Sequence, residues 1–394
     1  MFPEILFANP NFGHTLAVCL DTALHIFCHL KTVGSEGKML LFRWLSNSCR
    51  VYTRPIILLV ALAFIAIITL LLWKNFYYHC WQMDFDLDSN LLYLKPVANA
   101  QPPKPINHKV AKSSWSWLNG TNLSDNITLV TAYFELGSFK KGLLNVITPT
   151  KYKKWMSVYA RILNPLVIYT DSEDVYKQFQ QLRAQHSTQH ITKLILIRKE
   201  KLWAFQIKSQ IDSIFQQDGY PTFSPNTVNA EYSCIMHAKF ELLQQSIDNN
   251  YFLTKYFMWI DIGYFRYETE KNNLFGLSVP QRFDENSVAY SEVCDFQNYS
   301  FKDIVWNNRV WVAGGANLGR FDVLTTFCKE YINRVKKALE ERIISTDQQI
   351  IYAMYTDKEK PSSNLQLCIA GWFCLGYLSI RSWQNQNPKF NNTS

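Results

Sequence analysis

The chain is 394 residues long, with 48% hydrophobic and 15% aromatic residues and a formal net charge of +8. This size and composition exclude a low-complexity chain and allow a large buried core in two units at most. The basic residues form no blocks, so the sequence does not predict nucleic-acid binding. A mildly basic surface does favour anionic substrates.

An uncharged apolar run near the N-terminus predicts a membrane anchor. The 18 residues from Ile56 to Trp73 carry no charge. As a helix they would span about 27 Å, close to the hydrocarbon thickness of a bilayer. A buried core helix is the alternative; a cleaved signal peptide fits less well because the run begins so far into the chain. We therefore expect a transmembrane helix at 55–73.

The flanks of this run predict its orientation. Arg43, Arg50 and Arg54 precede it, whereas Lys74 and then three aspartates follow it, which favours a cytoplasmic N-terminus. The glycosylation acceptors of the pattern Asn-x-Ser/Thr all follow the run, at Asn119, Asn122, Asn126, Asn298, Asn391 and Asn392. The sequence thus predicts a single-pass type II membrane glycoprotein of the Golgi apparatus or endoplasmic reticulum, with a cytoplasmic tail at 1–54.

Cysteines beyond the anchor would lie in a compartment where disulfides persist. They are Cys80, Cys234, Cys294, Cys328, Cys368 and Cys374. Since six cysteines allow many pairings, the sequence predicts no particular one.

A stem and an α/β domain are expected after the anchor. Residues 74–125 combine acids, prolines and glycosylation acceptors, as in a lumenal stem. In 126–394, apolar runs of strand length alternate with stretches of helical period, which predicts a mainly parallel sheet flanked by helices. The expected strands are 127–134, 165–170, 193–197, 256–262 and 309–315.

Polar segments follow four of these strands. A doubly wound sheet binds its ligand outside the carboxyl ends of its strands, at a reversal of strand order. The segments in question are 131–135, 170–174, 261–266 and 314–320. We therefore expect them to share one rim of the sheet.

Six segments, in order, carry a family resemblance: LVTAYFELG, PLVIYTDSED, EYSCIMHAKFELL, KYFMWIDIGYFR, VAGGANLGR and STDQQIIYAMY. Over residues 127–375 they resemble the HtrL/YibB (WlaTC/HtrL-like) family, which is grouped with the glycosyltransferases. The wider resemblance is to GT-A glycosyltransferases, and it implies a Rossmann-type domain that binds a nucleotide-sugar donor.

The resemblance implies a role for Asp261, which ends the apolar run FMWI. In GT-A enzymes an acid pair at this place holds Mn²⁺ or Mg²⁺, which neutralises the leaving phosphate. Here Gly263 replaces the second acid, and no histidine follows His237. Either Asp261 holds a metal together with phosphates and waters, or cations such as Arg266 and Arg320 replace the metal.

Structural alternatives remain for the acids. Asp261 could cap a turn in which Gly263 supplies a positive φ. A literal D-x-D occurs in DFDLD at 84–88, but it follows no expected strand and is interpreted as a solvated acidic patch.

Asp347 in STDQQ has two interpretations. Thr346 and Gln349 form a capping-box pattern, and an acid in the first turn complements the helix dipole. In GT-A enzymes an acid at such a helix start deprotonates the acceptor hydroxyl, so the resemblance implies that Asp347 is the general base.

Further candidates come from the expected rim. Thr131 and Tyr133 could contact the nucleotide, and Asp171 could bind ribose. Asn317 and Arg320 could meet phosphate or acceptor hydroxyls at a helix start. A core tyrosine, an Asx-turn and a tight strand-to-helix turn are the respective structural alternatives. Lys239 interrupts an apolar helix face, which favours an inward-reaching charge.

Together these features predict a glycosyltransferase that moves a sugar from a nucleotide donor to a glycan, protein or lipid acceptor. Asp261 would hold the metal or donor phosphates, and Asp347 would act as base. The alternative is a catalytically inactive lumenal protein of the same fold that binds carbohydrate or a protein partner.

Overall fold

The computed structural model describes residues 93–96, 124–142, 145–358 and 360–388. The predicted tail, the predicted anchor at 55–73, the acidic run at 84–88 and most of the predicted stem lie outside these residues. Within the described ranges, no helix is both long enough and apolar enough to cross a bilayer.

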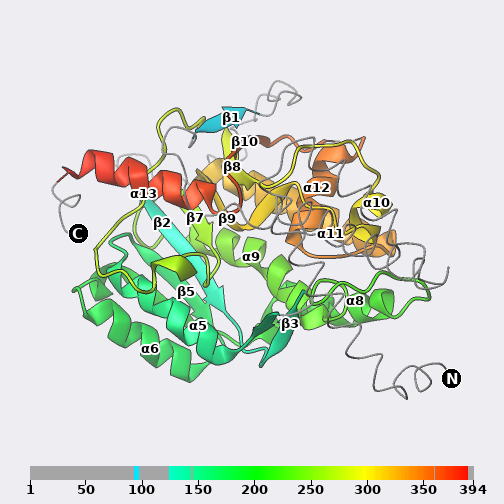
Figure 1. The fold of residues 1–394 in the computed structure, drawn as a ribbon, viewed down its shortest axis with the longest axis horizontal. Coiled ribbons are helices and arrows are strands. Elements are labelled where there is room, and N and C mark those ends of the chain that lie inside the picture. Colours follow the sequence, from blue (N-terminus) through cyan, green and yellow to red (C-terminus); the bar gives the residue numbers. More distant parts are fainter. Residues whose placement is uncertain (1–92, 97–123, 143–144, 359, 389–394) are drawn as a thin grey trace, which may run out of the picture. The chain divides into compact units, whose positions relative to one another are not determined.

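An eight-stranded sheet with the order β1-β10-β8-β9-β7-β2-β5-β6 forms the centre of the described chain (Figure 1). Its strands are β1 Leu94–Pro96, β2 Ser124–Tyr133, β5 Leu166–Thr170, β6 Thr192–Leu196, β7 Thr254–Ile260, β8 Ser287–Glu292, β9 Val312–Arg320 and β10 Asn364–Cys368. β7, β2, β5 and β6 pair in parallel, as do β10 and β8. The expected mainly parallel α/β sheet is therefore confirmed.

Helices cover both faces of the sheet (Figure 1). They are α5 Pro149–Met156, α6 Glu173–Ala184, α7 Trp203–Gln206, α8 Lys208–Phe215, α9 Ala230–Asn249, α10 Phe301–Trp306, α11 Phe321–Glu340, α12 Asp347–Thr356 and α13 Cys374–Gln386. Apolar side chains of α9, α11 and α12 share one core with Phe257 and Trp259. Those of α6 and α13 share the other with Met258 and Ile260. Successive side chains of β7 point to opposite faces of the sheet and therefore enter the two cores in turn. This explains why the sequence of β7 is almost continuously apolar.

Strand β9 departs from the expected arrangement. It pairs antiparallel with β7, with Ile260 opposite Ala316 and Tyr256 opposite Arg320. The segment 314–320 therefore lies inside a strand and does not follow one. Because β9 runs antiparallel to β7, it begins around Gly314 beside the carboxyl end of β7. It ends at Arg320, beside the amino end of β7.

The predicted boundary between stem and domain also changes. Leu94–Pro96, assigned to the stem from sequence, form β1 and pair antiparallel with β10. Strands β8 and β10 were not predicted.

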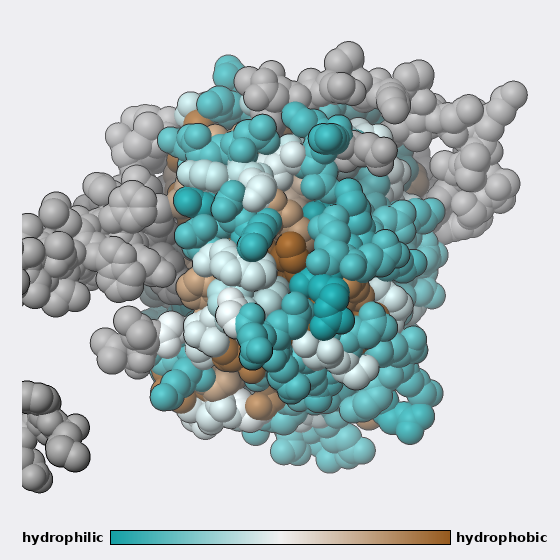
Figure 2. All heavy atoms as spheres, turned by 90° about the vertical axis from the view of Figure 1, so that its right-hand side faces the viewer, coloured by the Kyte–Doolittle hydropathy of each residue, from teal (hydrophilic) through white to brown (hydrophobic). Residues whose placement is uncertain are grey.

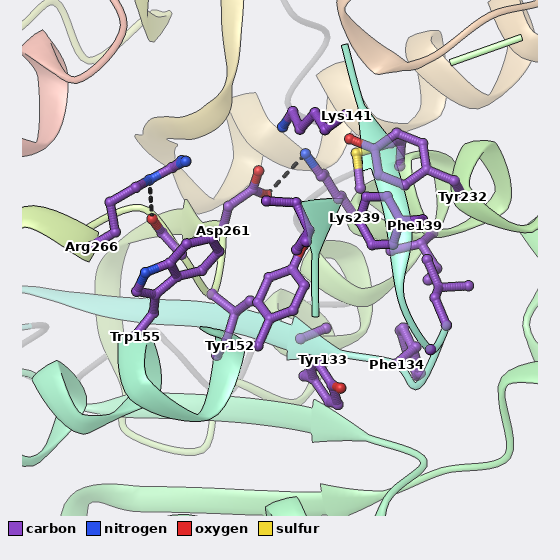
Figure 3. A pocket seen from close by; sticks show the side chains of 18 of the residues that line it. Tyr133, Phe134, Phe139, Lys141, Tyr152, Trp155, Tyr232, Lys239, Asp261 and Arg266 are labelled. Atoms are coloured by element: carbon purple, nitrogen blue, oxygen red, sulfur yellow. Dashed lines mark hydrogen bonds and ion pairs between the residues drawn. The ribbon is translucent and has the colours of Figure 1, made fainter. Parts of the chain in front are cut away.

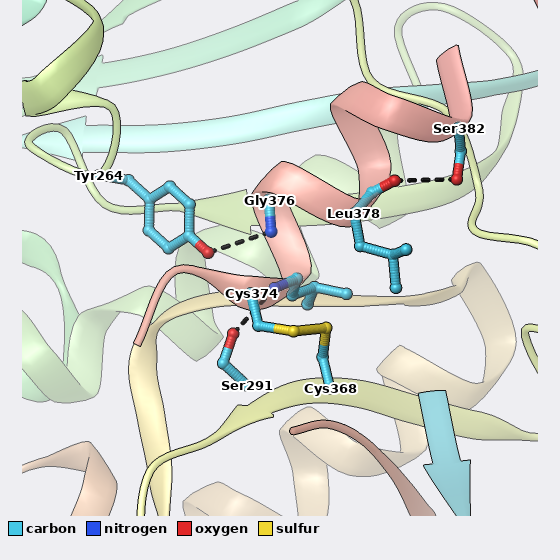
Figure 4. Close-up of a disulfide and its surroundings, with 8 residues drawn as sticks. Tyr264, Ser291, Cys368, Cys374, Gly376, Leu378 and Ser382 are labelled. Atoms are coloured by element: carbon cyan, nitrogen blue, oxygen red, sulfur yellow. Dashed lines mark hydrogen bonds between the residues drawn. A yellow bond between two sulfur atoms is a disulfide. The ribbon is translucent and has the colours of Figure 1, made fainter. Parts of the chain in front are cut away.

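One disulfide links Cys368, at the end of β10, to Cys374, at the start of α13 (Figure 4). Nearby, Leu375 N donates to Ser291 Oγ at 3.0 Å and Gly376 N donates to Tyr264 Oη at 3.1 Å. These contacts fix the first turn of α13 against β8, β10 and the segment after β7.

A small antiparallel hairpin lies outside the main sheet. Its strands are β3 Phe139–Lys141 and β4 Asn145–Ile147. Gly142 N donates to Ser224 O at 3.0 Å, which attaches the hairpin to the segment before α9. The face of the molecule turned toward the viewer in Figure 2 is mainly hydrophilic, with apolar side chains in small patches.

Candidate active site

A cavity opens at the carboxyl ends of the parallel strands β2 and β7. It encloses about 850 Å³ of space, its open mouth included. Aromatic side chains form much of its wall: Tyr133, Phe134, Phe139, Tyr152, Trp155, Tyr232 and Trp259. Its charged side chains are Lys141, Lys239, Asp261 and Arg266 (Figure 3). In the sheet, β2 has β5 and then β6 on one side and β7 on the other side. The strand order therefore reverses between β2 and β7, and the cavity lies at this reversal.

Asp261 is fixed at the first position after β7. Its backbone N–H donates to Gly315 O at 2.8 Å, and Tyr159 Oη donates to its carbonyl oxygen at 3.2 Å. The carboxylate Oδ1 accepts from Trp259 Nε1 at 2.8 Å and from Lys239 Nζ at 2.9 Å. Its side chain is 36% exposed. Among the described residues no donor reaches Oδ2, so this oxygen is the one left for a ligand.

Lys239 extends from α9 into a group of three oxygens. Its Nζ lies 2.9 Å from Asp261 Oδ1, 2.8 Å from Asp347 Oδ2 and 3.0 Å from Gly314 O. An ammonium group has three hydrogens, and here each one has an acceptor. Burial opposes the charged form of Lys239, but Asp261 and Asp347 outweigh burial and raise its pKa. Lys239 is therefore a permanent cation that joins both predicted catalytic acids.

Asp347 occupies a different environment from the one expected of a general base. It begins α12 and is 2% exposed, and it does not border the cavity. Burial raises its pKa, while the charge of Lys239 opposes that rise. A general base must come within hydrogen-bond reach of the acceptor hydroxyl. In this structure Asp347 does not meet that requirement, because it pairs with Lys239 at 2.8 Å and lies outside the cavity lining.

The predicted capping box at this helix start is only partly formed. Thr346 is the N-cap residue, but its hydroxyl donates to Gln349 Oε1 at 2.8 Å and caps no backbone N–H.

Gly263 has a steric reason to lack a side chain. A Cβ at this position would lie 2.6 Å from Cε3 of Trp155. No carboxylate fits there unless the indole moves. A second acid at this position would thus clash with an aromatic ring that packs directly on the backbone next to Asp261.

Two cations face the cavity without an ion pair among the described residues. Lys141 comes from the β3–β4 hairpin; burial and the nearby Arg266 lower its pKa to about 8. Arg266 donates from Nε to Gly263 O at 2.8 Å, and its guanidinium lies 5.1 Å from the Trp155 ring and 5.3 Å from the Phe373 ring. Figure 3 shows both side chains directed toward Asp261.

The described residues do not fit a resident divalent metal at Asp261. No three His, Cys, Asp or Glu side chains converge anywhere in the described part of the chain. The Oδ1 of Asp261 already has two donors, and Lys239 occupies the space between the two acids. A metal at Oδ2 would also meet the charge of Lys141 and Arg266, which like-charge repulsion disfavours.

Three other predicted residues lie near the rim, and their polar side-chain atoms already have partners in the protein. Thr131 is fully buried, 3.5 Å from the Tyr159 hydroxyl. The Tyr133 ring lines the cavity, but its hydroxyl donates to Glu135 Oε2 at 3.0 Å. Asp171 accepts from Glu135 N at 2.9 Å and lies 3.5 Å from Lys199 Nζ, so both of its oxygens have partners. Of the three, only Tyr133 reaches the cavity.

The candidates on β9 lie away from the cavity. Asn317 is 2% exposed and pairs with Trp259 inside the sheet. Arg320 lies opposite Tyr256, roughly 16 Å along the strand from Asp261. Its guanidinium binds Asp322 at 2.6 Å and Glu285 at 3.2 Å. The antiparallel direction of β9 explains why these two predictions do not hold.

Sequence reasoning did not identify Lys141, Tyr152 or Trp155 as cavity residues. The only signal for Lys141 was a short polar segment after β2 with glycines on both sides, which marks a turn and not a binding residue. Tyr152 and Trp155 pack edge to face at 5.1 Å, and the sequence pattern of such a pair does not distinguish a cavity wall from a core.

Comparison with known proteins gives the family. The family described as "Bacterial protein of unknown function (HtrL_YibB)" matches residues 125–376. The chain belongs to the HtrL/YibB family. The match includes every charged residue of the cavity.

A curated relative agrees with this assignment. Protein HtrL of Escherichia coli (strain K12) is 23% identical over 251 residues, which cover 59% of this chain and 85% of the relative. The family description and this relative's name specify no reaction.

Two solved structures resemble this HtrL/YibB chain weakly. Core-mannan synthase A from Aspergillus fumigatus, in its Mn/GDP form, is 10% identical, covers 68% of this chain and 76% of its own, and has a TM-score of 0.32. The PaToxG glycosyltransferase is 13% identical, with coverage of 62% and 77% and a TM-score of 0.27. At such low scores neither likeness assigns a function to this chain.

Replacing Lys239 by Met in this HtrL/YibB protein is expected to destabilise it. The change leaves Asp347 buried without its partner, which costs about 3 kcal/mol or more. Denaturant unfolding of the full-length chain measures this loss. Lys140→Met, at an exposed position of the hairpin, should leave stability unchanged. The double variant Lys239→Met/Asp347→Asn should lose less than the two single losses combined; full additivity would contradict the buried pair.

Substitution of Gly263 tests the packing of Trp155. Gly263→Ala forces its methyl group against the indole and should cost about 1 to 3 kcal/mol in unfolding free energy. In a Trp155→Ala background the same change should cost clearly less, because the space is then free. An equal cost in both backgrounds would show that the ring does not limit this position.

Proposed function

We propose that the chain is a glycosyltransferase that binds a nucleotide-sugar donor in this cavity. One observation carries the proposal: among the described residues, Asp261 presents one carboxylate oxygen without a donor to an aromatic-walled cavity, where Lys141 and Arg266 have no ion pair. The aromatic walls suit a nucleobase or sugar ring. The two cations suit a diphosphate, and the free oxygen of Asp261 suits the acceptor hydroxyl.

The chemistry of transfer follows from these placements. The bond between the anomeric carbon and the diphosphate oxygen breaks, and a bond to the acceptor oxygen forms. Negative charge develops on the leaving diphosphate, where preorganised cations stabilise the transition state. The acceptor hydroxyl gives up its proton, and Asp261 Oδ2 is the carboxylate oxygen open to the cavity that could accept it.

For location, we propose a type II membrane protein of the Golgi apparatus or endoplasmic reticulum, with the domain in the lumen. The apolar run at 56–73 and the position of every glycosylation acceptor beyond it support this proposal. The Cys368–Cys374 disulfide agrees with an oxidising compartment. The acceptor would be a glycan, protein or lipid of that compartment.

A second candidate function is binding without transfer. The burial of Asp347 favours it, because a single carboxylate oxygen then remains for acid–base chemistry. A protein of this kind would hold a nucleotide sugar or glycan and leave it intact.

Donor binding and turnover separate these two candidates. The full-length protein, offered a panel of nucleotide sugars, should bind at least one and slowly release its nucleoside diphosphate. Asp261→Asn should lower that release by about 100-fold or more, since it removes the carboxylate. Asp322→Asn, which alters the Arg320 cluster outside the cavity, is the matched control.

The outcomes are distinct. Binding without release, unchanged by Asp261→Asn, would favour the second candidate. No binding of any donor would contradict both.

The pKa of Lys141 predicts how donor affinity depends on pH. Only the protonated ammonium attracts a diphosphate, and burial and Arg266 hold the pKa of Lys141 at about 8. Affinity should therefore be highest below pH 8 and fall as the pH rises above it. A bound diphosphate favours the charged lysine and moves the fall to higher pH.

Calorimetric titration of the donor across this range measures the effect. Lys141→Arg should flatten the profile while retaining affinity, because arginine stays protonated. A profile unchanged by this substitution would remove Lys141 from the binding site.

A further inference from the structure

The position between the two acids is already occupied by a protein cation. Lys239 Nζ lies within 3.0 Å of Asp261 Oδ1, Asp347 Oδ2 and Gly314 O. All three of its hydrogens have acceptors, so Lys239 offers none to a ligand. A Cβ at Gly314 would lie 2.3 Å from Asp347 Oδ2, so the backbone closes tightly around this group.

No second carboxylate replaces the ones that Lys239 uses. The Trp155 indole fills the space next to Gly263. The only carboxylate among the residues lining the cavity is Asp261, and one of its oxygens already accepts two hydrogen bonds.

The cavity nevertheless carries an excess of positive charge. Lys239 and the two acids leave one negative charge, and Lys141 and Arg266 add two positive charges at the wall. The positive charges of Lys141 and Arg266 attract a diphosphate and repel a divalent metal ion.

Arg266 is held in an orientation that favours phosphate. Its Nε is fixed by Gly263 O, and the rings of Trp155 and Phe373 lie near its guanidinium. Among the described residues no acceptor is bound to its two Nη atoms. A guanidinium held in this way can donate two parallel hydrogen bonds to phosphate oxygens with little loss of side-chain freedom.

We propose that Lys141 and Arg266 neutralise the diphosphate of the donor in place of a divalent metal, while Lys239 keeps the acids from binding one. This inference rests on the proposed function and specifies how the same site recognises its donor. Lys239 is then a positioning residue, and Lys141 and Arg266 are the groups that touch the ligand.

The test is calorimetric titration of the full-length protein with UDP and with GDP, in EDTA and in excess Mn²⁺. One or both nucleotides should bind in EDTA, with an affinity that Mn²⁺ changes by less than about threefold. Lys141→Met and Arg266→Met should each weaken binding by about tenfold or more, since each removes a charged hydrogen-bond donor. Lys140→Met, the exposed neighbour on the same hairpin, should leave it unchanged.

Failure of this inference differs from failure of the proposed function. If nucleotide binding requires Mn²⁺, or if it survives the loss of both Lys141 and Arg266, metal-free recognition is wrong. The proposed function, which needs only that the donor binds, would still stand. If neither diphosphate nor any nucleotide sugar binds under either condition, the inference and the proposed function both fall.

Discussion

The candidate site depends on the ammonium group of Lys239. It lies 3% exposed, between two carboxylates and a backbone carbonyl, and satisfies all three. Without it, the buried Asp347 would face the desolvation cost of an unpaired charge. The ammonium group joins helix α9 to the end of β7 and to the start of α12. Asp261 therefore has a fixed orientation, and among the described residues only its Oδ2 is left for a ligand.

This arrangement explains the incomplete acidic motif after β7. A side chain at Gly263 would overlap the Trp155 indole, which belongs to the aromatic wall of the cavity. The same indole lies against Arg266. At this position the site therefore holds an aromatic ring and a cation next to a single carboxylate.

Much of the fold and one central residue could be predicted from the sequence. Apolar runs of strand length alternating with stretches of helical period predicted the parallel strands β2, β5, β6 and β7 with flanking helices, and the rule for strand ends placed Asp261 at the rim. The direction of β9 could not be predicted, because a buried strand has the same apolar pattern in either direction. Arg320 was misplaced for that reason.

The remaining errors have a similar cause. An aspartate at a helix start has the same sequence pattern whether it is exposed to solvent or buried against a lysine of another helix, so the sequence does not show that Lys239 is the partner of Asp347. Lys141 lies on a short hairpin with no strong periodicity, and only its position in space brings it to Asp261.

A structure of the full-length protein with a bound nucleotide sugar tests the central claim most directly. The account predicts the diphosphate within hydrogen-bond distance of Lys141 and Arg266, Asp261 Oδ2 next to the bound sugar and open to an acceptor, and Lys239 still bonded to both acids. A ligand bound elsewhere, or a metal ion bridging Asp261 and the diphosphate with Lys239 displaced, would contradict it.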